Sequence, residues 1–145
     1  MMSTKEIKAL VRHWYKRWNM GKAAALAVMD ETCATNYVTH AGGIGPDIHG
    51  LKDNKQDTSE TFKAFPNIHL TIDDILVDGN KVATRWTLTG TQKGEFMGHP
   101  PTNKKVTVWG ITIDRVAKGM FVESWIRYDN LSFMQQLGIV PTPKR

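Results

Sequence analysis

Residues 106–129 read VTVWGITIDRVAKGMFVESWIRYD, and this pattern predicts two long antiparallel strands joined by a turn. Polar and apolar residues alternate through residues 106–115 and again through residues 120–129, which is the period of two that a β-strand produces. Between them, Ala117-Lys118-Gly119 has the composition of a tight turn. We therefore expect this stretch to form the last hairpin of an antiparallel sheet.

Four side chains of the second strand, Glu123, Trp125, Arg127 and Asp129, stand two residues apart and should leave from one face. A face with two acids, an indole and a guanidinium predicts a polar cavity. A carboxylate beside an aromatic ring is one way to build a proton-transfer site without a metal or cofactor. Asp129 is also placed to cap a helical turn over residues 131–137, and both roles are open.

The strands before this hairpin show the same period. Residues 68–77 and 81–91 alternate in polarity, and Asp78-Gly79 between them is a strong hairpin signal. Glycine and proline residues interrupt residues 90–105, which we expect to form a long loop. The second half of the chain is therefore predicted to be a four-stranded meander.

The first half is mainly helical in pattern. Ser3 and Glu6 fit a capping box, and apolar residues then recur at helical spacing as far as Trp18. Three further elements are predicted: a short helix over residues 22–29, a short strand over residues 37–40 and a helix over residues 51–65.

This order of elements predicts an α+β fold in one domain over residues 1–145. We expect a cone-like, strongly curved antiparallel or mixed sheet, wrapped around the N-terminal helices and enclosing a pocket on its concave side. The outer surface of such a sheet is expected to form a homodimer or a higher homo-oligomer.

Composition narrows the classes of function. The chain is 41% hydrophobic and 23% charged, and its net charge of +5 is scattered, so we expect no nucleic-acid partner. The single cysteine, Cys33, excludes an internal disulfide, and no Cys/His spacing predicts a metal site. The longest apolar run, residues 23–29, is too short to span a bilayer, and the charged N-terminal stretch is unlike a signal peptide, so we expect a cytoplasmic protein.

Five spaced segments resemble the SnoaL-like polyketide cyclases, an ester cyclase family of the nuclear transport factor 2-like superfamily. They are residues 90–96, residues 100–102, residues 113–119, Glu123-Ser124-Trp125 with Asp129, and residues 136–138. The sequence departs from the family pattern at Asn67, where the family has Asp, and at Asn103, where Gly is common.

The resemblance implies a cystatin-like α+β barrel and a cofactor-free cyclase, isomerase or lyase acting on a small hydrophobic, polyketide-like or cyclic substrate. It places the acid/base role of the family's last-strand aspartate on Asp129. His40 is a second candidate catalytic residue. The candidate substrate-binding residues are Trp125, Tyr15, Arg85, Trp109 and Arg127, although Arg127 is equally suited to pairing with Glu123.

Other functions are tested by the same residues. Related cyclases carry a histidine on the penultimate strand, whereas residues 106–115 contain none. A limonene-type epoxide hydrolase needs an Arg-x-Asp that Arg85-Trp86-Thr87 does not supply. A ketosteroid-isomerase-like site needs an acid near His40, and we expect none there. The alternative from another class is a non-catalytic protein that binds a small molecule in the same cavity.

Overall fold

The computed structural model describes residues 1–144 of the chain and contains a six-stranded mixed sheet. Its order is β2-β1-β6-β5-β4-β3, and β1 runs parallel to β6 while all other neighbours are antiparallel. The strands are β1 (Cys33–His40), β2 (Ile48–His49), β3 (His69–Asp78), β4 (Lys81–Thr91), β5 (Lys105–Ala117) and β6 (Met120–Tyr128).

Four α-helices accompany the sheet: α1 (Thr4–Trp18), α2 (Lys22–Thr32), α3 (Leu51–Ala64) and α4 (Asn130–Gln136). The predicted capping box is confirmed, because Ser3 Oγ accepts from the backbone N–H of Glu6 while the Glu6 carboxylate accepts from the backbone N–H of Ser3. A short 3₁₀ turn, η1 (Gly42–Ile44), and the two-residue strand β2 have no counterpart in the sequence-based prediction. The other predicted elements are confirmed, with ends shifted by a few residues.

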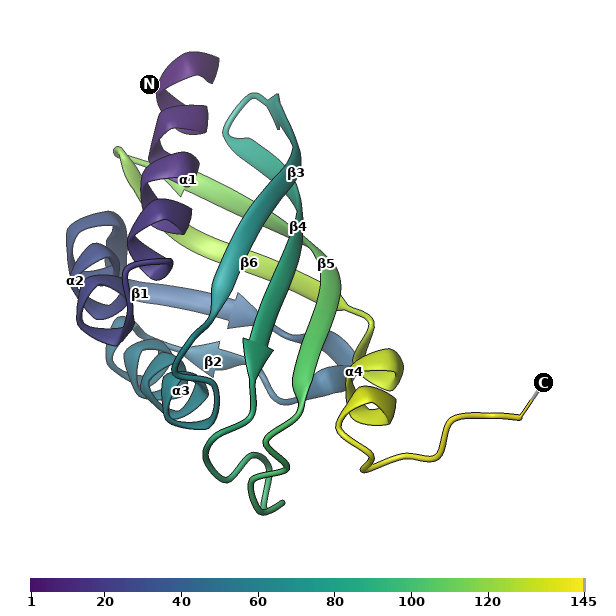
Figure 1. Ribbon diagram of the computed structural model, residues 1–145. Helices are drawn as coiled ribbons and strands as arrows, with labels where there is room; N and C mark the ends of the chain where they lie inside the picture. Colours follow the sequence, from purple (N-terminus) through teal and green to yellow (C-terminus); the bar gives the residue numbers. More distant parts are fainter. Residues whose placement is uncertain (145) are drawn as a thin grey trace.

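The helices close the curved sheet into a cone (Figure 1). Helix α1 contacts β3 at one edge of the sheet and also contacts α2, whereas α3 contacts α2 and β1 near the other edge. The three helices therefore bridge the two sides of the sheet over its concave face. Residues Ile7, Val11 and Tyr15 of α1 are buried there, at the four-residue spacing that places them on one helical face.

The strands β5 and β6 place a different set of side chains on the concave face from the one that the sequence suggested. In the middle of β5 the exposed residues are Trp109, Ile111 and Ile113, whereas Thr112 and Asp114 face inward. The pairing of β5 with β6 shifts its register between Arg115 and Val116, which is a β-bulge on the β6 side.

This bulge decides which residues of β6 reach the interior. Phe121 and Ser124 both line the interior although they stand three residues apart, which an uninterrupted strand does not allow. Glu123, Trp125 and Arg127 consequently lie on the outer face, so the predicted polar cavity on their side of the strand is wrong.

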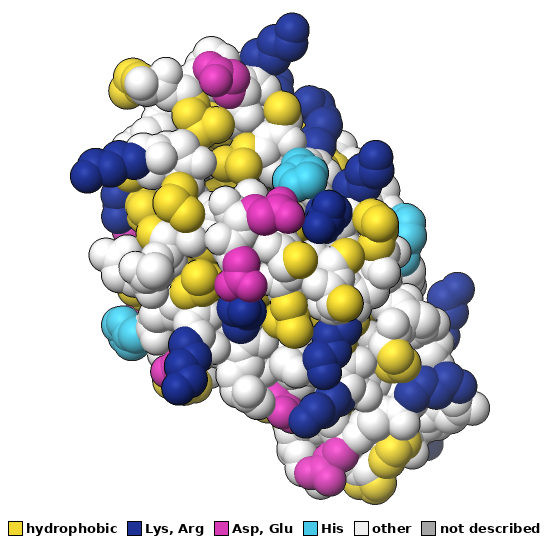
Figure 2. Space-filling model, turned by 90° about the vertical axis from the view of Figure 1, so that its left-hand side faces the viewer, with side chains coloured by type: hydrophobic (Ala, Val, Ile, Leu, Met, Phe, Trp, Pro, Cys, Tyr) yellow, Lys and Arg dark blue, Asp and Glu magenta, His cyan; other side chains and the backbone are white. Residues whose placement is uncertain are grey.

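The helical side of the molecule is shown in Figure 2, where acidic and basic side chains are interspersed with small hydrophobic patches. None of the helices within residues 1–144 is both long and apolar enough to cross a membrane.

One close approach in the sheet shapes the interior. A Cβ atom added at Gly110 of β5 would overlap the ring of Trp86 from β4, so the missing side chain lets the indole lie directly against the backbone of β5. The indole N–H then donates to Thr112 Oγ1 at 2.9 Å. Gly110 thereby fixes the position of one aromatic wall of the interior.

The substitution Gly110→Ala is expected to destabilise the fold by about 1–3 kcal/mol, because the new methyl group displaces the Trp86 ring in a packed interior. Urea unfolding monitored by tryptophan fluorescence measures this loss. The matched control is Gly43→Ala, at a glycine where an added Cβ meets nothing and whose φ lies outside the left-handed region. Equal losses in the two variants would contradict the packing argument.

Candidate functional site

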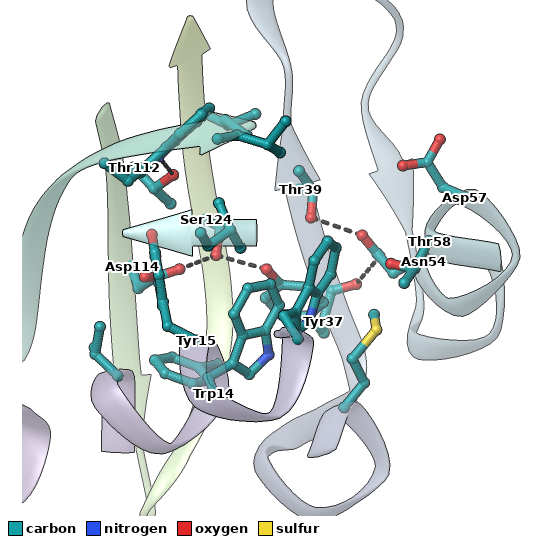
Figure 3. A pocket seen from close by; sticks show the side chains of 18 residues that line it. Trp14, Tyr15, Tyr37, Thr39, Asn54, Asp57, Thr58, Thr112, Asp114 and Ser124 are labelled. Carbon is teal, nitrogen blue, oxygen red and sulfur yellow. Dashed lines mark hydrogen bonds between the residues drawn. The ribbon is translucent and has the colours of Figure 1, made fainter. Parts of the chain in front are cut away.

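The cone encloses a cavity between α1, α3 and the concave face of the sheet, with about 170 Å³ of space for water-sized molecules (Figure 3). Much of its wall is aromatic, from Trp14, Tyr15, Trp18, Tyr37, Trp86 and Phe121. Its polar lining comes from Thr39, Asn54, Asp57, Thr58, Thr112, Asp114 and Ser124. An apolar cavity with a few convergent polar groups is the usual form of a small-molecule site.

Asp114 is the carboxylate at the inner end of this cavity. Its side chain is buried, and among residues 1–144 its only hydrogen-bond donor is the Ser124 hydroxyl, from the neighbouring strand. Burial raises the pKa of Asp114 to about 6, and the hydrogen bond from Ser124 offsets only part of this effect. A carboxylate with this pKa is largely charged at neutral pH and still accepts a proton readily, as a general base requires.

Two tyrosines flank the carboxylate. The Tyr37 hydroxyl lies 2.6 Å from Ser124 Oγ, so Tyr37, Ser124 and Asp114 form one hydrogen-bonded row (Figure 3). Tyr15 enters from α1 on the other side, beside Thr112. Burial, and then the negative charge of Asp114, raise the pKa of both tyrosines above their usual range, so both hydroxyls stay protonated and able to donate.

Other polar groups of the lining have a structural role. Asn54 of α3 donates to the backbone carbonyls of Tyr37, Ile48 and Gly50 and accepts from Thr39 Oγ1 at 2.6 Å. These bonds hold α3 against β1 and β2. Since these carbonyls occupy both N–H groups of Asn54, its amide has no free donor for a ligand.

Asp57 of α3 lies at the mouth of the cavity. It lines both the cavity and a neighbouring surface groove formed by the end of α3 and residues 95–98. Burial raises the pKa of the Asp57 carboxyl, and the nearby charge of Glu60 adds to the shift. Asp114 is thus the deep carboxylate and Asp57 the peripheral one.

Of the seven site residues predicted from the sequence, Tyr15 alone lines this cavity. Asp129 is exposed at the end of β6, where its carboxylate accepts from the backbone N–H of Ser132 at 3.0 Å and caps α4. Trp125 lies outside the cavity lining as well, so it does not shield a carboxylate there. The geometry therefore does not support Asp129 as the acid/base residue, because a group outside the cavity cannot reach a substrate within it.

His40 belongs to a separate cluster on the outer face. Its ring stacks on Trp125 with centroids 5.4 Å apart, and its nitrogens bond Asp47 Oδ2 at 2.7 Å and Glu123 Oε2 at 2.6 Å. The expectation that no acid lies near His40 is wrong, because the strand pairing of β1 with β6 brings Glu123 beside it. The hydrogen bonds from Glu123 and Asp47 raise the pKa of His40, but the ring does not line the cavity.

The remaining predicted residues also lie on the outer face. Arg127 donates to the carbonyl oxygens of His40 and Ile126, so its predicted pairing with Glu123 is wrong. The partner of Glu123 is instead Arg115, whose Nε lies 3.1 Å from Glu123 Oε1. Arg85 is exposed, with Asp73 as its nearest acid at 3.9 Å. Trp109 is 50% exposed. These side chains form a surface, not a pocket.

Metal ligation has no candidate in the part of the chain that the structure describes, since residues 1–144 contain no group of three or more His, Cys, Asp or Glu side chains placed to hold an ion.

Asp114 was not predicted from the sequence, because the choice of Trp109 as a substrate-binding residue turns the opposite face of β5 toward the interior. The alternating set Trp109, Ile111 and Ile113 is the more hydrophobic, and hydrophobic residues are normally the buried ones. A weak signal was available, because Thr112 and Asp114 alternate with that set. The pairing of Asp114 with Ser124 gave no such signal, since it depends on the bulge and not on the turn at residues 117–119.

Comparisons with known proteins agree with this architecture. The family model described as SnoaL-like polyketide cyclase matches residues 8–137. Among curated proteins, none matches the chain at a significant level.

Several solved structures are similar along most of their length. IdmH, a proposed polyketide cyclase from Streptomyces antibioticus, is 30% identical with a TM-score of 0.76, and the match covers 90% of this chain and 97% of IdmH. AclR, a proposed hydroxylase from Streptomyces galilaeus, is 26% identical with a TM-score of 0.86, covering 99% of this chain and 87% of AclR.

A protein with a ketosteroid isomerase-like fold from Catenulispora acidiphila is 20% identical to this chain, with a TM-score of 0.73. The match covers 92% of this chain and 97% of the other protein, and at this identity it is evidence for the fold alone. The chain thus has the α+β, nuclear transport factor 2-like fold that such structures share. Since the family model spans most of the sequence, the chain belongs to the SnoaL-like polyketide cyclase family.

Proposed function

We propose that the protein is a cofactor-independent acid/base enzyme of the cyclase, isomerase or lyase type, acting on a small hydrophobic, polyketide-like or cyclic carbonyl compound. The observation that carries this proposal is the buried carboxylate of Asp114 at the inner end of an aromatic cavity. The proposed acid/base residue is therefore Asp114 of β5, in place of Asp129.

The chemistry needs a base near a carbon–hydrogen bond and a donor near the carbonyl oxygen. Asp114 removes a proton from the carbon next to the carbonyl, and Tyr15 is placed to donate to the oxygen as negative charge develops on it. The resulting enolate can attack a second carbonyl in a cyclisation, expel a neighbouring leaving group or take back the proton at another carbon. Membership of the cyclase family and the likeness to IdmH support the first outcome.

The size of the cavity favours a small reacting ring. A cavity of about 150 Å³ with apolar walls is known to hold one benzene molecule, so about 170 Å³ accommodates one ring, with the rest of a larger molecule at the open mouth.

The test is hydrogen exchange of ketones in heavy water, followed by proton NMR. The panel contains cyclohexanone, 2-indanone and 2-tetralone, which carry exchangeable hydrogens beside one carbonyl. Protein-dependent loss of the α-hydrogen signals is expected for at least one of them. Binding of these ketones without accelerated exchange would instead favour a non-catalytic small-molecule-binding protein, the alternative that the apolar lining also fits.

We further propose that the outer face of the sheet pairs with a second copy of the chain. Trp109, Ile111 and Ile113 are 50%, 49% and 39% exposed and form a continuous stripe along β5, with Trp125 beside Ile113 on the next strand. Monomeric proteins rarely expose contiguous apolar patches of this kind. Arg85 and Arg127 flank Ile111 on the two neighbouring strands, so the stripe has the polar rim that protein interfaces usually have.

The substitution Ile111→Asp is expected to weaken dimerisation at least ~30-fold, because it places a charge at the centre of an apolar interface, where hot-spot losses reach about 2 kcal/mol or more. Sedimentation equilibrium of wild type and variant measures the effect. Leu131→Asp is the matched control, since Leu131 is 60% exposed on α4, outside the stripe. A monomeric wild-type protein at high concentration would contradict the proposed interface.

A further inference from the structure

A row of three buried side chains crosses three adjacent strands of the cavity wall. Ser124 of β6 pairs with Thr39 of β1 on one side and with Asp114 of β5 on the other. Its hydroxyl lies 2.6 Å from the Tyr37 hydroxyl and donates to Asp114 Oδ1. Tyr37, Ser124 and Asp114 are 8%, 2% and 9% exposed, so bulk water does not compete for these bonds.

The direction of this row depends on the protonation of Asp114. A serine hydroxyl has one proton, and a charged carboxylate can only accept. While Asp114 is charged, Ser124 therefore donates to it, and Tyr37 must donate to Ser124. Once Asp114 holds a proton, the row can reverse: Asp114 donates to Ser124, Ser124 donates to the Tyr37 oxygen, and the Tyr37 proton becomes free to point into the cavity that Tyr37 lines.

We infer that Tyr37 is a second catalytic residue and Ser124 a relay, and that the row carries a proton from Asp114 to the carbonyl oxygen of the substrate. This inference rests on the proposed role of Asp114 as the base. It narrows the reaction to one that passes through an enol, a neutral intermediate with the proton moved from carbon to oxygen.

The step is balanced. The substrate C–H bond breaks, and its proton forms an O–H bond on Asp114 while the electron pair of the C–H bond enters the enolate. In one concerted step Asp114 then passes a proton to Ser124, while Ser124 passes its own to Tyr37 and Tyr37 passes its own to the enolate oxygen. The enol is the product, and Asp114 is again a carboxylate.

The relay explains how a tyrosine in this environment can act as an acid. Burial keeps the pKa of Tyr37 above its usual range, so a free phenolate is strongly disfavoured inside the cavity. In the relay Tyr37 receives a proton as it loses one, and no buried phenolate forms. Ser124 acts similarly, because its oxygen exchanges one proton for another.

The test uses the panel ketone that the wild-type protein exchanges fastest, with the variants Tyr37→Phe, Ser124→Ala and Ser124→Thr. The first two are expected to lower kcat about 10²-fold or more, the usual size of a general-acid contribution, while KM changes less than about threefold. Ser124→Thr keeps the hydroxyl and is expected to recover most of the lost rate. A structural role alone predicts no such separation of kcat from KM.

Rates in mixtures of H₂O and D₂O give a second readout. Several protons moving together give a curved dependence of kcat on the deuterium fraction in the wild type, and Ser124→Ala is expected to make it linear. A wild-type kcat in Tyr37→Phe would overturn the relay. If Asp114→Asn abolishes exchange while Tyr37→Phe does not, the relay fails and the proposed function stands. Exchange that survives Asp114→Asn would overturn both the relay and the proposed function. A wild-type protein that exchanges none of the panel ketones would also overturn both.

Discussion

Replacing Asp114 by Asn is expected to lower the rate of α-hydrogen exchange by about 10²–10⁴-fold, the contribution usual for a general base. The amide oxygen of Asn can still accept from Ser124, so the strand pairing and the fold should persist. An amide nitrogen cannot take the substrate proton. Exchange rates from NMR, with circular dichroism to confirm folding, measure the effect.

The matched control for this variant is Asp129→Asn. Asp129 caps α4 through its bond to Ser132, and Asn is an equally good N-cap, so helix and fold should be unaffected. Because Asp129 lies outside the cavity, activity should also be unchanged. The reverse result, loss in Asp129→Asn and full activity in Asp114→Asn, would restore Asp129 as the acid/base residue.

The second large effect concerns stability and pH. The pKa of Asp114 rises from 3.8 to about 6 on folding, so between these values the folded protein holds a proton that the unfolded chain has lost. The free energy of unfolding therefore falls as pH rises from about 4 to about 6. Above that range the buried charge costs about 3 kcal/mol, the equivalent of the shift.

The variant Asp114→Asn removes this dependence. It is expected to be about 3 kcal/mol more stable than the wild type at pH 8 and of similar stability at pH 4. Urea unfolding of both proteins across this range measures the difference, and the subtraction cancels groups common to both, such as Asp57 and Glu123. If the free energy of unfolding of the variant depended on pH as it does in the wild type, Asp114 would not be the group whose raised pKa causes this dependence. A gain in stability with a loss of activity is typical of a functional carboxylate.

Local patterns in the sequence were sufficient for most secondary structure. The capping box at Ser3 and Glu6 begins α1, and the hairpin signal at Asp78-Gly79 joins β3 to β4. These features depend on residues only a few positions apart, so the sequence contains all of the interactions involved. The short strand β2 was missed because two residues give no period, and because its bonds to β1 come from Val38 and Thr39.

The candidate site could not be predicted in the same way. The bulge in β6 decides that Ser124, and not Glu123, faces the interior, and nothing in the alternation of residues 120–129 marks it. Strand β5 exposes its more hydrophobic face. The alternation of residues in a strand shows which side chains share a face. Which of the two faces packs against the helices depends on packing elsewhere in the chain.

The sequence by itself determined the α+β class, the order of the elements, the resemblance to the cyclase family and the capping ability of Asp129, since these rest on local spacing and on matching segments. Only the tertiary structure decided which carboxylate is enclosed. Burial raises the pKa of Asp114 because the helices and strands packed around the cavity remove water from it, whereas Asp129, at the end of the stretch that defines the hairpin, stays in solvent. Desolvation is a property of the whole packed chain, so the chemically active acid is not identifiable from its neighbours in sequence.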